Sequence, residues 1–135
     1  MNPPLPDRCV TAIVCVDAVQ FAENPAAAYT EMRRVLVPGG RVVLTCWELV
    51  DRTDDRLPVR VRRVDTRGGL VHAGFADVAV EPRPQWRAAE LAMWQEAAML
   101  DPGDNLALQS FHDEGIRVLS TFDQSKRVVA SATAP

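Results

Sequence analysis

The sequence predicts an α/β domain, because strand-like and helix-like patterns alternate along the chain. Residues 10–16 (VTAIVCV) form a short β-branched apolar run, which is typical of a strand covered on both faces in a parallel sheet. A helix is expected to begin with Asn24 as its N-cap and Pro25 at its first position, and to end before Pro38-Gly39-Gly40. A second buried strand at 41–47 completes a βαβ unit.

The second half of the chain adds two more strands with helices between them. Apolar periodicity, alternation and turn residues place each element. We expect one domain over residues 1–135, since the chain shows no internal repeat and no low-complexity linker. The expected elements are a helix at 58–72 that is interrupted near Gly68-Gly69, a strand at 76–81, helices at 87–100 and 104–121, and a strand at 127–132.

Length and composition fit one soluble globular domain, with 135 residues of which 47% are apolar and 24% charged. The formal charge of −3 argues against nucleic acid as a partner, because nucleic-acid binders present a basic face. No apolar run reaches the roughly 18 residues of a membrane span and no signal-peptide pattern is present, which predicts a cytoplasmic protein without a membrane partner. The three cysteines show no metal-ligand spacing, so no metal site is expected.

Two stretches of the chain carry a family resemblance. Residues 14–21 (VCVDAVQF) and 31–44 (EMRRVLVPGGRVVL) resemble class I S-adenosylmethionine-dependent methyltransferases, in particular their small-molecule type 11 branch. In that family the E-x-x-R-V-L-x-P-G-G-R run leads into the fifth strand, and Ala73-Gly74-Phe75 matches the approach to the sixth. The resemblance implies a truncated Rossmann-like methyltransferase fold of about four strands, the first two parallel and the last antiparallel. It also places residues 86–122 as a helical lid inserted between the last two strands.

The same resemblance draws attention to cofactor elements that this sequence does not contain. In the family a glycine-rich turn follows the first strand and an acidic residue ends the second. This sequence has neither, and Thr11 stands where the family commonly has aspartate. We therefore expect no cofactor and no S-adenosylmethionine site in this chain alone. The strand at 10–16 becomes an edge strand, which predicts a homodimer or a chain supplying the missing half at that strand.

Candidate site residues follow from the rule that ligands of open α/β sheets bind outside the carboxyl ends of the parallel strands. The carboxylates of Asp17 and Glu48 leave neighbouring strand ends, where apolar walls would raise the pKa of each and suit acid and base catalysis. Both also have a structural interpretation, as a turn cap and a solvated charge, and large apolar side chains on helices are more often core than ligand contacts. The expected substrate-binding residues are Gln20, Phe21, Trp47, Trp86, Met93, Trp94, Met99 and His112.

A run of arginines between the second and third strands resembles an anion site. These residues do not share one helical stripe, and several aspartates lie close by in the sequence. A solvated charged face is therefore the favoured interpretation. The arginines are Arg60, Arg62, Arg63 and Arg67.

Three functional hypotheses follow. The favoured one is a cofactor-independent cyclase or isomerase of methyltransferase ancestry that acts on an apolar small molecule, such as a polyketide-type natural product. It is favoured because the residues on the substrate side remain bulky while the cofactor elements are missing, and because folding a substrate into a reactive shape can itself accelerate a cyclisation. The alternatives are the C-terminal half of a split or truncated small-molecule methyltransferase, and a non-catalytic binding or dimerisation remnant.

Overall fold

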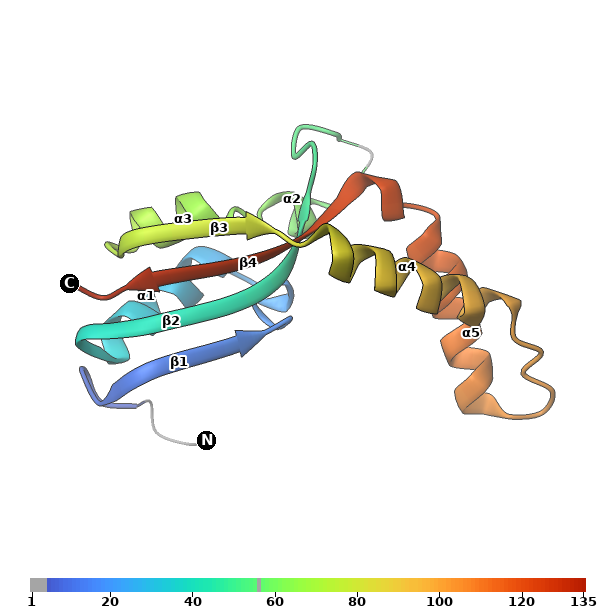
Figure 1. Cartoon of the computed structure of the whole chain (residues 1–135), viewed down its shortest axis with the longest axis horizontal. Coiled ribbons are helices and arrows are strands. Elements are labelled where there is room, and N and C mark those ends of the chain that lie inside the picture. The colour runs from blue at the N-terminus through green and yellow to red at the C-terminus, as the bar shows by residue number, and fades with distance from the viewer. Residues whose placement is uncertain (1–4, 56) are drawn as a thin grey trace.

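A four-stranded sheet with the order β1-β2-β4-β3 forms the centre of the molecule (Figure 1). The computed structural model describes residues 5–55 and 57–135. The strands β1 and β2 are parallel, and β4 runs antiparallel to both β2 and β3, which confirms the expected fold class. The elements are β1 (Val10–Val16), η1 (Val19–Phe21), α1 (Pro25–Val35), β2 (Leu36–Leu49), α2 (Val59–Arg62), α3 (Thr66–His72), β3 (Ala76–Pro82), α4 (Pro84–Met99), α5 (Leu106–Leu119), η2 (Phe122–Gln124) and β4 (Ser125–Thr133).

The β1-α1-β2 unit begins as its sequence predicts. Pro25 is the first residue of α1, and the Asn24 side chain accepts a hydrogen bond from the Ala27 amide at 3.2 Å. The end of the helix differs from the expectation, because β2 starts at Leu36 and includes the Pro-Gly-Gly turn. Leu36 already pairs with Val10, and the turn residues form an irregularity in the ladder before regular pairing resumes.

The expected helix at 58–72 is two helices, and the break lies before Gly68-Gly69 rather than at it. Asp65 provides the break, since its side chain accepts a hydrogen bond from the Gly68 amide at 3.0 Å and caps α3. A Cβ at Gly69 would lie 2.3 Å from ring carbons of Tyr29. Gly69 is therefore required for close packing of α3 against α1.

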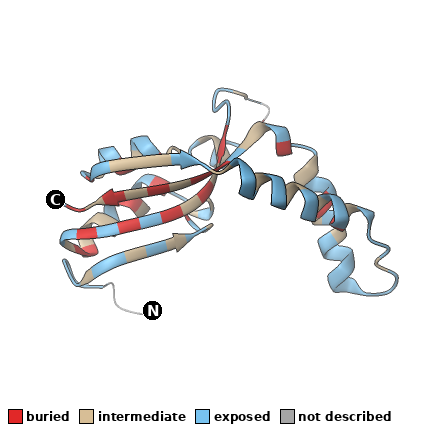
Figure 2. Ribbon diagram, viewed as in Figure 1, coloured by how far each residue is buried: buried red, intermediate tan, exposed pale blue. Residues whose placement is uncertain are grey.

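The hydrophobic core lies on one face of the sheet, where α1 and α3 cover it (Figure 2). Tyr29 of α1, Leu44 of β2 and Leu70 of α3 are fully buried there. The expectation that residues 10–16 are covered on both faces is wrong, because Val14 and Val16 are 73% and 65% exposed. Within the described residues β1 pairs with β2 alone and is an edge strand. Its coverage by a second copy stays a prediction.

Helices α4 and α5 form a helical arm, defined here as residues 84–119, that projects from one end of the sheet (Figure 1). The two helices pack closely at Gly115, where a Cβ would lie 3.1 Å from the Cβ of Ala97. The arm occupies most of the segment expected as the lid insertion between the last two strands. Across residues 5–55 and 57–135, no helix combines the length and apolarity that a membrane span requires.

Candidate functional site

A pocket of about 580 Å³ lies where the carboxyl ends of β1 and β2 meet the helical arm. This is the edge of the sheet at which the sequence predicts a ligand site. Its volume falls in the range of roughly 300–1,000 Å³ that is usual for small-molecule sites. We call it the large pocket, and its lining residues are Asp17, Gln20, Phe21, Trp47, Glu90, Met93, Trp94, Glu114, Val118, Thr121, Phe122 and Ser125.

Arg127 of β4 joins the two sides of the large pocket. Its side chain is 6% exposed, and its two terminal nitrogens donate to the Asp17 carboxylate, with Nη2 2.6 Å from Oδ2. Its Nε lies 2.9 Å from Oε1 of Glu90 on α4. The guanidinium also lies 5.2 Å from the centre of the Trp47 ring. One buried cation therefore holds a carboxylate from the sheet and another from the helical arm.

Asp17 is fixed in an unusual backbone conformation at the end of β1. Its φ of 51° lies in the left-handed region, which non-glycine residues seldom adopt outside constrained sites. The hydroxyl of Thr45 donates to its Oδ1 at 2.8 Å. Hydrogen bonds from Arg127 hold the pKa of Asp17 below its usual range, against the opposing effect of burial. The expectation that apolar walls raise the pKa of Asp17 is therefore wrong, because it overlooked the arginine.

Glu90 is another carboxyl group of the large pocket, and its pKa is raised. Burial is the main cause, and the negative charge of Asp17 adds to it, while Arg127 opposes the shift. A carboxyl group with a raised pKa exchanges protons more readily near neutral pH. Of the two carboxyl groups that contact Arg127, Glu90 is therefore the one whose pKa shift has the direction expected for an acid or base.

Glu48 does not line the large pocket but lines a smaller, adjoining one of about 120 Å³. Its Oε1 accepts a hydrogen bond from the Thr66 amide at 2.8 Å, and its Oε2 lies 3.5 Å from Nζ of Lys126. Asp17 and Glu48 do not line one common pocket, although they leave neighbouring strands. The structure therefore separates the two proposed catalytic carboxylates and gives Glu48 a structural partner at the start of α3.

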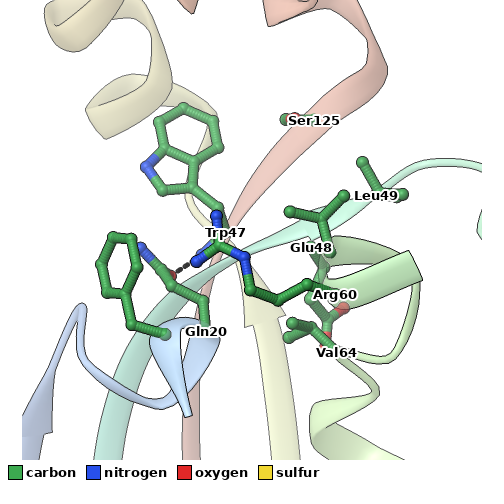
Figure 3. A pocket seen from close by; sticks show the side chains of 9 residues that line it. Gln20, Trp47, Glu48, Leu49, Arg60, Val64 and Ser125 are labelled. Carbon is green, nitrogen blue, oxygen red and sulfur yellow. Dashed lines mark hydrogen bonds between the residues drawn. The ribbon is translucent and has the colours of Figure 1, made fainter. Parts of the chain in front are cut away.

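Aromatic side chains form the walls of the large pocket. The rings of Trp47 and Phe122 meet edge to face with their centres 5.4 Å apart. The ring centres of Trp94 of α4 and Phe111 of α5 are 5.6 Å apart. This contact between the two helices of the arm keeps the Trp94 side chain in place. Gln20 accepts a hydrogen bond from the Trp47 amide through its side-chain oxygen at 2.8 Å (Figure 3). Because that oxygen is engaged, the amide nitrogen of Gln20 is left as a donor.

Three of the expected substrate-binding residues line neither pocket. Trp86 is exposed near the start of α4 and lies against Arg83, with 5.8 Å between the guanidinium carbon and the ring centre. Met99 is exposed at the end of α4, far along the arm. His112 of α5 contacts Asp113, its neighbour in the chain. The structure brings together Asp17, Gln20, Phe21, Trp47, Met93 and Trp94 from the expected set.

Two charged residues at the large pocket, Glu90 and Arg127, are not among the residues expected from the sequence. Glu90 carries a usable signal, since it precedes Met93 and Trp94 by three and four positions and must share their helix face. Arg127 carries none, because its partner Asp17 is 110 positions away in the chain. The other lining residues that were missed are Glu114, Val118, Thr121, Phe122 and Ser125.

The residues of the two pockets do not form a cradle for S-adenosylmethionine. Such a cradle requires glycines that let the backbone approach the cofactor, and no glycine of the described chain lines either pocket. Gly69 and Gly115 serve helix packing instead. Among the described residues, no group of three or more His, Cys, Asp or Glu side chains could hold a metal ion.

Comparison with known proteins agrees with this geometry. Residues 1–44 match the family model of the methyltransferase domain. No curated protein matches the sequence. The matched segment contains β1, α1 and the first part of β2, which are the elements that carry the resemblance to class I methyltransferases.

Solved structures extend the likeness to nearly the whole chain. A phosphoethanolamine N-methyltransferase of Haemonchus contortus, in complex with phosphomonomethylethanolamine and S-adenosylhomocysteine, is 14% identical with a TM-score of 0.72 over 97% of this chain and 35% of its own. The [4+2]-cyclase SpnF is 21% identical with a TM-score of 0.66 over 99% of this chain and 53% of its own. A putative sarcosine dimethylglycine methyltransferase of Galdieria sulphuraria is 13% identical with a TM-score of 0.69 over 97% and 55%.

The chain thus spans between about a third and about a half of the structures it resembles. Its sheet order, the inserted arm and the family match together confirm the resemblance to class I S-adenosylmethionine-dependent methyltransferases. What the chain has is one part of that fold, and the part contains the carboxyl edge of the sheet with its large pocket.

Proposed function

We propose that this chain binds an apolar small molecule in the large pocket and promotes its cyclisation or isomerisation without a cofactor. A polyketide-type natural product has the matching size and character. The observation that carries the proposal is the combination, in one pocket of about 580 Å³, of aromatic walls and a carboxyl group with a raised pKa, that of Glu90.

Aromatic walls supply the first half of this chemistry. Trp47, Trp94 and Phe122 offer flat apolar surfaces that favour a folded conformation of a flexible substrate. Holding reacting groups in the right orientation can account for several kcal/mol of a barrier. Gln20 adds a hydrogen-bond donor that would orient a substrate oxygen.

Glu90 supplies the second half. As a carboxylate it would take a proton from a carbon beside a carbonyl group of the substrate, and return it at another carbon, so that the product is an isomer. Arg127, which is itself held by Asp17, keeps the Glu90 side chain in place and does not transfer the proton. Because the proton returns to the product, the step needs no oxidant, reductant or second substrate.

A second candidate is the substrate-binding part of a small-molecule methyltransferase. The match of residues 1–44 to the methyltransferase domain favours it. Since no glycine of the described residues lines the pockets, methyl transfer would need a cradle from residues outside this chain. The large pocket would then hold the methyl acceptor, and its aromatic walls would serve the same purpose.

The mass of the product separates the two candidates. The purified chain is incubated with a panel of linear polyketide-type substrates, with and without S-adenosylmethionine, and products are followed by chromatography and mass spectrometry. The proposal predicts products of unchanged mass that form without S-adenosylmethionine. Products heavier by a CH₂ unit, formed only with S-adenosylmethionine, would instead support the methyltransferase.

Glu90→Gln tests the role of the carboxyl group, with Glu96→Gln on the exposed side of α4 as a matched control. General acid–base catalysis typically contributes about 10²–10⁴-fold, so Glu90→Gln should slow isomer formation by that order and Glu96→Gln should not. Unchanged rates in Glu90→Gln would show that substrate orientation alone drives the reaction.

A further inference from the structure

The smaller pocket adjoins the large one and has a different chemical character. Both pockets are lined by Gln20, Phe21, Trp47 and Ser125, so they meet along these four side chains. In the close view of Figure 3, the Arg60 side chain extends from α2 across the pocket. The smaller pocket, of about 120 Å³, has room for a compact group rather than for a ring system.

The acidic side chain of the smaller pocket is already neutralised by the protein. Glu48 is 9% exposed, and its Oε1 accepts a hydrogen bond from the Thr66 amide. The ammonium of Lys126 lies 3.5 Å from its Oε2. It therefore has little left to offer a ligand. Groups of this pocket that can still donate a hydrogen bond include the guanidinium of Arg60, the amide nitrogen of Gln20 and the hydroxyl of Ser125.

Arg60 differs from Arg62 and Arg67 of its segment. Arg62 donates to the Leu57 carbonyl at 3.0 Å and Arg67 to the Val78 carbonyl at 3.0 Å, so both serve the fold. Arg60 instead lies over the Phe21 ring, 5.5 Å from its centre, and takes part in none of the ion pairs found among residues 5–55 and 57–135. Arg60 is exposed, as expected for a solvated charged face, and it also lines the smaller pocket beside the Phe21 ring.

We propose that the smaller pocket binds a carboxylate or phosphate group of the ligand whose apolar body lies in the large pocket. Arg60 and the Gln20 amide would donate hydrogen bonds to the anionic oxygens, and a guanidinium suits such groups because its N–H bonds match their geometry. This inference rests on the proposed function, since it adds an anionic head to the apolar ligand. It narrows the substrate class to an amphiphile with one anionic end.

Matched naphthalene probes test the inference in the full chain. The probes are 2-naphthoate, 2-naphthyl phosphate and the neutral 2-naphthalenemethanol, and binding is measured by calorimetry. We expect the better of the two anionic probes to bind about tenfold tighter than the neutral one, which corresponds to about 1.4 kcal/mol. Comparison of the two anions shows whether the pocket prefers a carboxylate or a phosphate.

Arg60→Met removes the charge and keeps an unbranched side chain against Phe21, and Arg63→Met is the control, since Arg63 lies in the same segment but lines neither pocket. The preference for anions should disappear in Arg60→Met and persist in Arg63→Met, with binding of the neutral probe unchanged in both. Equal binding of neutral and anionic probes by the natural chain would contradict the inference that the smaller pocket binds an anionic group. The proposed function would not be affected by that result. Failure of all three probes would overturn both.

Discussion

The sheet with its helices α1 and α3 and the helical arm are built in different ways. Leu70 of α3 is fully buried, whereas Leu106 at the start of α5 is 85% exposed. The core side chains interlock between sheet and helices, while the arm is held mainly by contacts of α4 with α5. Figure 2 shows the contrast, with buried residues concentrated in the strands and few along the arm. We therefore expect the sheet with α1 and α3 to contribute most of the free energy of unfolding. The arm completes the wall of the large pocket.

The large pocket lies at the junction of these two regions. Arg87 of α4 donates to the carbonyl oxygens of Phe122 and Ser125 at 2.8 and 2.9 Å, which anchors the base of the arm. Arg127 and Glu90 form the second link. A few directional polar contacts therefore fix the position of the arm relative to the sheet. The packing of α1 and α3 on the sheet rests instead on many apolar contacts.

The largest difference between the regions should come from deleting buried and exposed leucines. Leu70→Ala leaves a cavity in a close-packed core and should lower the free energy of unfolding by about 2–5 kcal/mol. Leu106→Ala, on the exposed arm, should change it by less than about 0.5 kcal/mol. Urea denaturation followed by circular dichroism measures both. Equal losses in the two variants would show that the arm contributes to the core.

A smaller difference is expected from adding a methyl group at two packed glycines. Gly69→Ala places a Cβ 2.3 Å from carbons of the buried Tyr29 ring, so it should lower the free energy of unfolding by about 1–3 kcal/mol. At Gly115 the nearest atoms are 3.1 Å away, and the better helix propensity of alanine offsets part of the crowding. We therefore expect a clearly smaller loss for Gly115→Ala in the same denaturation assay.

The smallest effect should come from the carboxylates at the junction, and it should depend on pH. Arg127 holds the pKa of Asp17 below its usual range, so the carboxylate stabilises the fold above about pH 4 and loses that contribution as the pH falls. Asp17→Asn should thus be less stable than the natural chain at pH 7, and the difference should shrink towards about pH 3. Asparagine tolerates the left-handed backbone of this position.

The size of this effect stays below about 1 kcal/mol, because the Asp17 side chain is 37% exposed and water screens the ion pair. Glu90 should behave in the opposite way. Since burial raises its pKa, ionisation destabilises the fold as the pH rises, and Glu90→Gln should gain stability relative to the natural chain at higher pH. Thermal unfolding between about pH 3 and pH 8 measures both; parallel curves for the two variants would contradict the opposite pKa shifts.

Local signals in the sequence were sufficient for most of the elements. Asn24-Pro25 marked the start of α1 correctly because an N-cap and a first-turn proline act within one turn of the chain. Gly68-Gly69 was misread as a helix break, since sequence alone cannot show the Tyr29 ring that requires a glycine there. The apolar run of β1 predicted a strand buried on both faces for the same reason. Such a run does not show whether other elements pack on one face of the strand or on both.

The sequence by itself determined the class of the fold, the order of its elements and the edge of the sheet where a ligand would lie, because these follow from short-range patterns and from the family resemblance. The tertiary structure decided the chemistry of that edge. It placed Arg127 between Asp17 and Glu90, shifted the pKa values of these two carboxyl groups in opposite directions, and placed Glu48 in the smaller pocket with Arg60. Charge effects depend on distances of a few ångströms between side chains that are far apart in the chain, and only the folded molecule sets those distances.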